Sequence, residues 1–151
     1  MRYGKEIIAY LAGIIDGEGY IGIKKSLWEM EHRKDIYCPI YKEKIQIKMK
    51  DKEPLILFQK IFGGSIRQEK IKDKILFCWS VENLKAIKVL KLVYPFLRIK
   101  KKQAQICFKL RKNKESYLAR KKGGPRGRLM PKRILNYRER LWQQIKELNQ
   151  K

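Results

Sequence analysis

Residues 41–50, YKEKIQIKMK, alternate between apolar and polar side chains more regularly than any other part of the chain. In a strand, Ile45, Ile47 and Met49 would point to one side, and the lysines and the glutamine between them would point to the other. Such a strand needs a hydrophobic layer against one face, whereas an antiparallel sheet commonly leaves its other face open. The pattern therefore predicts a sheet that is covered on one side only.

The periodicity of the remaining sequence predicts helices and strands on both sides of this segment. Lys5 to Asp16 has the apolar spacing of a helix, which the glycines of GEG at 17–19 end, and a strand follows from Tyr20. Residues 26–39 are interpreted as a long turn or a distorted strand extension. Beyond residue 50 we predict a helix with Asp51 as its N-cap, strands over 65–71 and 75–81, and helices over 82–94, 96–114 and 134–149. This order predicts an α+β fold, with a four-stranded antiparallel sheet under a layer of helices.

The length of the chain favours a single domain. It has 151 residues, of which 44% are hydrophobic, enough for one core. The segment RKKGGPRGRLMPKR at 120–133 is too rich in Gly, Pro and Arg to belong to that core. We expect one domain over 1–151, with a core over about 5–117, a basic loop over 118–133 and a C-terminal helix over 134–150.

The chain is strongly basic, with 38 Lys and Arg against 15 Asp and Glu and a formal net charge of +23. Such a charge favours a polyanionic partner, and nucleic acid is the expected one, because neutralising phosphates releases counterions. An anionic membrane is the rival, but the sequence has no long apolar run, signal peptide or lipidation motif. We therefore expect an intracellular protein with no membrane association.

Cysteine and histidine are too few to support several kinds of site. Cys38, Cys78 and Cys107 are odd in number and far apart, which predicts neither a disulfide framework nor a CxxC metal site. His32 is the only histidine, so the sequence excludes histidine clusters for zinc and disfavours histidine-based nucleophilic catalysis. Any chemistry must rest on carboxylates and lysines.

The first predicted helix carries a stripe without large side chains. Ala9, Gly13 and Gly17 lie four residues apart, with Ala12 beside Gly13, so two such helices can approach closely. This approach brings two copies of the acids at the helix end together, and paired carboxylates are oxygen ligands for a divalent cation. Because the chain holds one copy of the stripe, the second carboxylate must come from a second subunit, which predicts a symmetric homodimer.

Asp16 is interpreted as a structural acid of this interface. A carboxylate at a helix C-terminus is unfavourable for the helix dipole unless it bonds backbone groups, and those of the partner helix are candidates. The expected dimer interface therefore includes Ala9, Ala12, Gly13 and Asp16.

The segment LAGIIDGEG at 11–19 resembles the LAGLIDADG signature of intron and intein homing endonucleases, and the predicted order of elements resembles the αββαββα core of that family. The resemblance implies a homodimeric, intron-encoded enzyme with a saddle-shaped sheet, from an archaeal cytoplasm or an organelle. Such an enzyme makes a double-strand break in a long pseudo-palindromic DNA site and so promotes intron mobility. The resemblance also implies that Glu18 is catalytic and binds Mg²⁺ or Mn²⁺ shared between the subunits, with the backbone carbonyl of Gly17 beside the metal.

A second site residue follows from the same resemblance. PFLRIKKKQAQ at 95–105 matches the turn after which the family places a lysine near the scissile phosphate, and Lys100 falls on that position. Lys101 and Lys102 are the competing candidates. A supporting glutamine of some relatives aligns with Met49, a departure that leaves Lys48 or Lys50 as substitutes, or a different water network.

The open face of the predicted sheet is the expected DNA-binding surface. Lysines at alternate positions of a strand suit the edge of a groove, although a solvated outer face would look similar. On the strands we expect contacts from Lys24, Ser26, Lys42, Lys44, Gln46, Lys48, Arg67, Glu69, Lys72 and Lys74. In the basic loop we expect contacts from Arg120, Lys121, Lys122, Arg126 and Arg128.

Two further functions remain open on the same scaffold. One is an RNA-binding maturase that assists intron splicing, for which the same charge would serve. The other is a regulator that binds DNA without cutting it, against which the retention of Gly17, Glu18 and Lys100 argues. A double-stranded DNA partner is expected in the leading interpretation, with intron RNA as a second partner in the maturase one.

Overall fold

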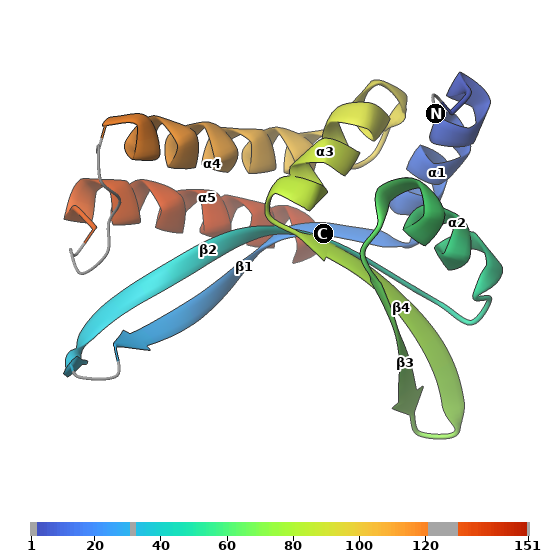
Figure 1. The fold of residues 1–151 in the computed structure, drawn as a ribbon, viewed down its shortest axis with the longest axis horizontal. Helices are drawn as coiled ribbons and strands as arrows, with labels where there is room; N and C mark the ends of the chain where they lie inside the picture. Colours follow the sequence, from blue (N-terminus) through green and yellow to red (C-terminus); the bar gives the residue numbers. More distant parts are fainter. Residues whose placement is uncertain (1–2, 31–32, 121–129, 151) are drawn as a thin grey trace.

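A computed structural model describes residues 3–30, 33–120 and 130–150. Figure 1 shows its elements, which follow one another as α1 (Lys5–Glu18), β1 (Gly19–Met30), β2 (Arg33–Met49), α2 (Glu53–Phe62), β3 (Ser65–Ile71), β4 (Lys74–Glu82), α3 (Leu84–Val93), the 3₁₀ helix η1 (Tyr94–Phe96), α4 (Lys101–Arg120) and α5 (Lys132–Gln150). The predicted α+β fold is confirmed. No helix of the described residues is long and apolar enough to cross a membrane.

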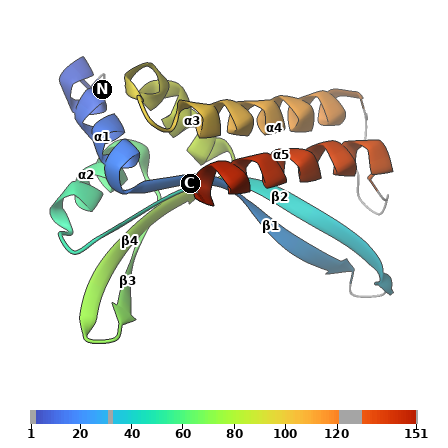
Figure 2. The same ribbon diagram turned by 180° about the vertical axis from the view of Figure 1, so that it is seen from behind.

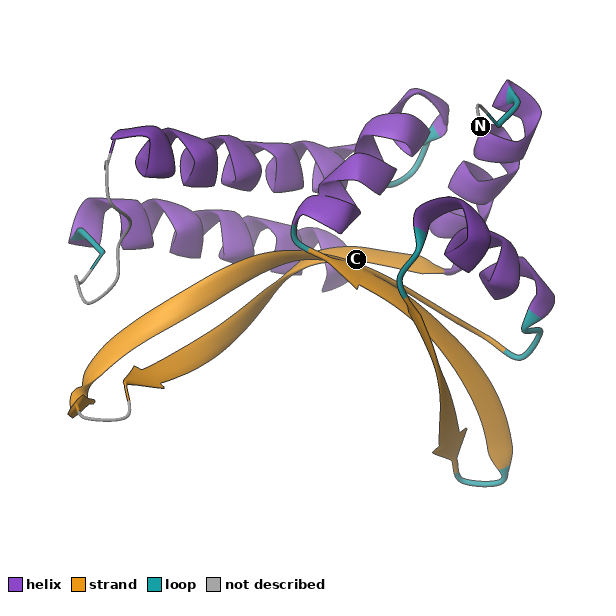
Figure 3. Cartoon of the chain, in the orientation of Figure 1, coloured by secondary structure: helices purple, strands orange, loops and turns teal. Residues whose placement is uncertain are grey.

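The four strands form an antiparallel sheet in the order β1-β2-β4-β3. The β1–β2 and β3–β4 hairpins bend away from each other, so the sheet arches like a saddle (Figure 1). The helices lie on its convex side and leave the concave side open, as Figures 2 and 3 also show. The prediction of a sheet covered on one side is therefore confirmed.

The covered side of the sheet carries the apolar residues that the alternation predicted. Ile45 pairs with Ile21 on β1 and with Val81 on β4, and Ile47 pairs with Trp79. All five side chains are buried. Burying apolar side chains of this size contributes about 1.5–3 kcal/mol each, so this layer supplies much of the stabilisation of the fold.

Of the two interpretations of residues 26–39, the distorted strand extension is confirmed and the long turn was wrong. Strand β1 runs to Met30 and β2 begins at Arg33, with one irregularity in their pairing between Trp28 and Met30. The backbone ladder between these long strands satisfies the N–H and C=O groups of a stretch whose side chains show no clear period. In the predicted loop over 118–133, residues 118–120 belong to α4 and residues 132–133 belong to α5.

The predicted N-cap of α2 was also displaced by one residue. Lys52 occupies the N-cap position and makes no side-chain capping bond. The Asp51 carboxylate nevertheless accepts a hydrogen bond of 3.0 Å from the backbone N–H of Glu53, so it still satisfies one of the free donors at the helix start.

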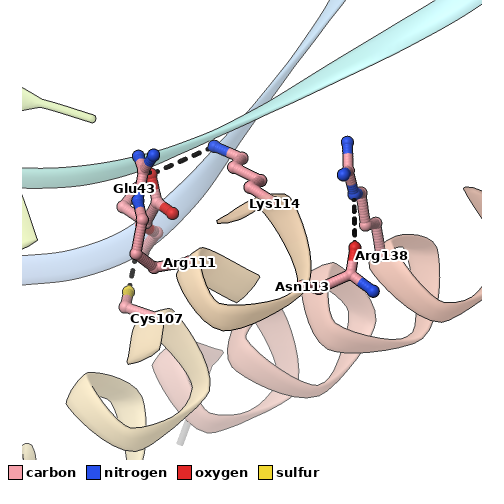
Figure 4. Close-up of polar contacts among 7 residues, drawn as sticks. Glu43, Cys107, Arg111, Asn113, Lys114 and Arg138 are labelled. Carbon is pink, nitrogen blue, oxygen red and sulfur yellow. Dashed lines mark hydrogen bonds and ion pairs between the residues drawn. The ribbon is translucent and has the colours of Figure 1, made fainter. Parts of the chain in front are cut away.

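A buried acid breaks the apolar pattern of the covered side. Glu43 of β2 is fully buried, and Figure 4 shows it facing α4. Its Oε2 accepts hydrogen bonds from Arg111 Nη2 at 2.6 Å and from Lys114 Nζ at 3.1 Å. Burial lowers the pKa of Lys114, and the Glu43 carboxylate opposes that effect. This cluster connects β2 to α4. The alternation of apolar and polar residues in the sequence did not predict it.

Two smaller contacts in the same region extend this connection. Burial raises the pKa of the Cys107 thiol, which donates a hydrogen bond to the backbone oxygen of Gly22 on β1 at 3.7 Å. Arg138 of α5 donates to Asn113 of α4 at 2.8 Å (Figure 4). The two long helices therefore dock on the first hairpin as a unit.

Replacing Glu43 with glutamine is expected to lower the free energy of unfolding by about 3 kcal/mol, because Arg111 and Lys114 keep their charges in a buried place without a counter-ion. Urea denaturation followed by circular dichroism measures the loss. The control is Glu115→Gln on the exposed side of the same helix, which should change stability by less than about 0.5 kcal/mol. Equal effects of the two variants would contradict a stabilising role for the cluster.

Candidate active site and nucleic-acid interface

Helix α1 delivers its last residues to the edge of the open sheet face. It buries Leu11, Ala12 and Ile15 in the core, whereas Gly17 and Glu18 are exposed. The chain enters β1 directly at residue 19, where a Cβ atom would lie 2.7 Å from the backbone oxygen of Ile15. Only glycine fits this close crossing, so the sharp passage from helix to strand fixes the place of Glu18.

Asp16 bonds backbone groups, as a structural acid should. Its carboxylate accepts hydrogen bonds from the backbone N–H groups of Arg98 at 2.7 Å, Ile99 at 3.2 Å and Lys100 at 3.1 Å. These donors belong to the turn that leads into α4 of the same chain. Its own chain therefore supplies the donors that offset its unfavourable place at a helix end. A place for Asp16 at a dimer interface stays a prediction.

Lys100 completes the same junction from the other side. Its Nζ donates to the backbone oxygens of Ile15 at 2.8 Å, Asp16 at 2.9 Å and Gly19 at 2.5 Å. A cation is favourable at this end of a helix, where carbonyl groups lack partners. Partial burial lowers the pKa of Lys100, although the carboxylates of Asp16 and Glu18 act in the opposite direction. Lys100 thus lies beside the segment that carries Gly17 and Glu18.

A hollow of about 320 Å³ joins this helix end to the open face of the sheet. Glu18 and Tyr20 line it from one side, and Gln46 and Lys48 of β2 line it from the other. Met49 is half-buried and packs against the core. Of the two lysines considered as substitutes for the family glutamine, Lys48 is the one that borders this hollow.

The open face gathers most of the strand residues predicted to contact DNA. Strand pairing sets Lys24 opposite Lys42, and Gln46 lies between Tyr20 and Ser80. A second hollow of about 550 Å³ is lined by three of the predicted residues, Lys24, Lys44 and Arg67. It is also lined by polar residues that the sequence did not predict, namely Ser65, Ser80, Glu82 and Lys85. The β4 residues carried no repeated lysine signal, so only the register brings them to this face.

Acidic residues on the open face pair with its lysines. Lys24 Nζ lies 3.5 Å from a Glu82 oxygen, and Lys48 Nζ lies 3.0 Å from a Glu69 oxygen. Glu69, predicted as a DNA contact, is in this structure the counter-ion of a lysine. These pairs are partly exposed, so each contributes little to stability.

An aromatic ring covers the one glycine of the open face on β1. A Cβ atom at Gly22 would lie 2.1 Å from the Tyr20 hydroxyl oxygen, so the ring extends across the glycine. Burial raises the pKa of Tyr20. The Tyr20 ring therefore lies over Gly22 and lines the hollow that it shares with Glu18, Gln46 and Lys48.

Several predicted residues lie elsewhere. Lys72 sits in the turn between β3 and β4 with a φ of 54°, and Arg120 is the last residue of α4. Lys121, Lys122, Arg126 and Arg128 are outside the described residues. Ala12, expected at the dimer interface, is fully buried in the core of its own chain.

The oxygen atoms at the end of α1 fit a divalent cation only in part. The described residues contain no group of three or more His, Cys, Asp or Glu side chains able to hold a metal ion. The Glu18 carboxylate is exposed and next to the Gly17 carbonyl, and hard cations prefer such oxygen ligands. One chain therefore offers one carboxylate, and a complete site needs further ligands.

The solved structures that resemble this fold include DNA complexes of homing endonucleases. One is I-CvuI bound to the I-CreI target with Mg, with a TM-score of 0.69 and 19% identity, covering 95% of this chain and 83% of the other. Another is the archaeal intron-encoded I-Vdi141I bound to DNA, with a TM-score of 0.69 and 17% identity, covering 93% and 82%. At these identities the likeness shows the fold.

The family of the protein is established from its sequence. The model of the LAGLIDADG endonuclease family matches residues 11–110, well over half of the chain. The protein therefore belongs to the LAGLIDADG endonuclease family, as the segment at 11–19 predicted. No curated protein matches the chain in sequence.

The two acids at the end of α1 should respond differently to neutralisation. Asp16→Asn is expected to lower the free energy of unfolding by about 1.5–3 kcal/mol, because three backbone donors lose a charged acceptor. Glu18→Gln, at an exposed position, should change it by less than about 0.5 kcal/mol. Thermal and urea unfolding of both variants measure the difference, and a reversed order would refute the assignment of Asp16 as the structural acid.

Proposed function

We propose that this protein is a homodimeric, divalent-metal-dependent, site-specific DNA endonuclease that promotes the mobility of its intron. The observation that carries the proposal is the place of Glu18, exposed at the end of α1, beside Lys100 and at the border of a hollow shared with Gln46 and Lys48. A metal-binding carboxylate next to a basic, open sheet is what phosphodiester hydrolysis on bound DNA requires. It would act inside the cell, where its DNA is.

Glu18 and the Gly17 carbonyl would hold Mg²⁺ or Mn²⁺, which supplies charge stabilisation for the phosphate and activation of water. Lys100 has its ammonium hydrogens directed at the backbone oxygens of Ile15, Asp16 and Gly19. It therefore contributes positive charge near the phosphate, and it holds Gly17 and Glu18 in place. A direct proton transfer from Lys100 would require it to release one of these carbonyls.

The strand residues of the open face would bind the DNA itself. Lys42, Lys44 and Lys48 suit phosphate contacts, whereas Gln46 and Arg67 have the paired groups that read base edges. Ser26 and Lys74 extend the surface toward the two hairpin ends. Lys72, Glu69 and the basic residues from Arg120 to Arg128 remain additional candidates for contacts outside this centre.

The exposed side of α1 supports the homodimer. A Cβ atom added at Gly13 or Gly17 would meet no heavy atom within 4 Å, so neither glycine is needed inside one chain. Glycine within a helix is less favourable than alanine by about 1 kcal/mol. The exposed Ile7 and Tyr10 lie along the same helix. A second copy packed closely against Ala9, Gly13 and Gly17 would explain the glycines and would bring a second Glu18 to the site.

The dimer is tested by filling this surface with Gly13→Leu. The variant chain should stay folded, because leucine is a better helix former than glycine and a Cβ atom at this position meets no heavy atom of its own chain within 4 Å. Sedimentation velocity should show a monomer where the unmodified protein is a dimer. Glu115→Leu adds the same side chain to another exposed helix position and should leave the dimer intact. A dimeric Gly13→Leu protein would remove α1 from the interface.

The nuclease is tested on a duplex that joins the sequences flanking its own intron. With Mg²⁺, the unmodified protein should cut both strands, and Glu18→Gln should cut at least about 100-fold more slowly while binding with unchanged affinity. The loss should also follow removal of the metal by a chelator. Tight binding without cleavage by the unmodified protein would favour a DNA-binding regulator. Cleavage by Glu18→Gln at the normal rate would refute only the metal assignment.

A further inference from the structure

A groove runs between α4 and α5 on the side of the molecule away from the open sheet face. Its main hollow has a volume of about 770 Å³ and receives Lys109, Lys112 and Ser116 from α4 and Arg133, Tyr137 and Arg140 from α5. A second hollow of about 310 Å³ shares Lys109 and Gln144 with the first and continues to Lys102. From Lys102 to Ser116 the helix rises roughly 20 Å, enough for several nucleotides of a strand.

The main hollow of this groove carries charge of one sign. No acidic residue is among those that line it, and the described part of the chain shows no ion pair to Lys109, Lys112, Arg133 or Arg140. The second hollow has one acidic residue in its lining, Glu147. The open sheet face differs, because there Lys24 and Lys48 have carboxylate partners. Gathered like charges oppose one another until an anion lies between them. The groove therefore favours a polyanion.

The groove also offers a surface for a flat ring. The Arg140 guanidinium lies 6.0 Å from the centre of the Tyr137 ring. Tyr137 is half-buried in the groove wall, and Ile134 lies in the same hollow. A tyrosine next to an arginine, set among phosphate-binding cations, is the combination on which unpaired bases stack.

The groove is separate from the candidate active site. Helices α4 and α5 cover the convex side of the sheet, and Glu18, Gln46 and Lys48 border the concave side (Figures 1 and 2). Packed helices lie about 8–10 Å apart. A duplex is too wide to enter between them and would rest on the rim, whereas an unpaired base can reach Tyr137.

We propose that the α4–α5 groove binds a single strand of nucleic acid, with its phosphates on Lys109, Lys112, Arg133 and Arg140 and a base against Tyr137. The site is independent of DNA cleavage on the other side of the sheet. RNA and single-stranded DNA offer the same phosphates and bases, so the experiment decides between them.

The test measures fluorescence anisotropy of labelled oligouridylate and oligothymidylate of about twenty nucleotides, with an excess of unlabelled duplex DNA to occupy the open sheet face. Single-strand binding should persist under the duplex. Lys109→Gln/Arg140→Gln should weaken it by about tenfold or more, and the slope of log K against log salt should fall by about 1.4 for two lost phosphates. The ratio of the two affinities identifies the strand as RNA or DNA.

Matched variants isolate the groove. Lys88→Gln/Lys91→Gln removes the same charge from exposed positions of α3 and should leave single-strand binding within about twofold. Tyr137→Phe should retain binding, and Tyr137→Leu should weaken it about tenfold through lost stacking. DNA cleavage should be unchanged in the groove variants, so a failure here is separate from a failure of the nuclease.

Three results would overturn the proposal. If duplex DNA displaced the single strand completely, the two would share one binding site, and the groove would not be a separate one. Equal losses in the α3 and groove variants would reduce the binding to net charge. The protein could also bind neither oligonucleotide but bind anionic lipid vesicles or an acidic peptide in a way that the groove variants weaken. That result would assign the groove to another partner.

Discussion

Asp16 and Lys100 join the C-terminal end of α1 to the turn before α4. The candidate active site at Glu18 depends on this junction. The Asp16 carboxylate binds free N–H groups of the turn before α4, and the Lys100 ammonium binds free carbonyls at the end of α1. Each charge meets backbone groups of opposite partial charge. The two residues therefore stabilise the same junction from opposite sides, and Glu18 lies in the segment whose carbonyl groups Lys100 binds.

Helix α4 connects this junction to the rest of the molecule. At its start it is bonded to α1 through Asp16 and Lys100, and in its middle Arg111 and Lys114 reach the buried Glu43 of β2. Glu43 lies between Lys42 and Lys44, two residues of the open face. The same helix therefore sets the distance between the proposed catalytic carboxylate and the strand proposed to read DNA.

The fold could be predicted from the sequence because its strongest signals are local. Ile45 and Ile47 alternate with polar residues in one strand, and the spacing of the apolar residues in α1 is helical, so burial alone determines both elements. Glu18 was singled out through a nine-residue resemblance at 11–19, and Lys100 through the match of residues 95–105 to the same family. The partners of Asp16 were not, because residues 98–100 are more than eighty positions away in the sequence.

Other features escaped prediction for the same reason. The role of Glu43 on the covered side depends on Arg111 and Lys114, which only the folded chain brings to it. Glu82 lies on the open face only because β4 pairs with β2. Contacts that depend on register and on helix docking leave no periodic trace in the sequence.

The carboxylates of Glu69 and Glu82 would reduce the affinity of the open face for a phosphate that makes no other contact. Lys48 and Lys24 already have an anion beside them, so a passing phosphate gains only the difference between two similar partners. A duplex whose base edges also match gains the rest from direct readout. If the open face binds DNA as proposed, these acids would compete with the phosphates of every unmatched duplex, and the strongly basic chain would leave wrong DNA quickly enough to continue its search.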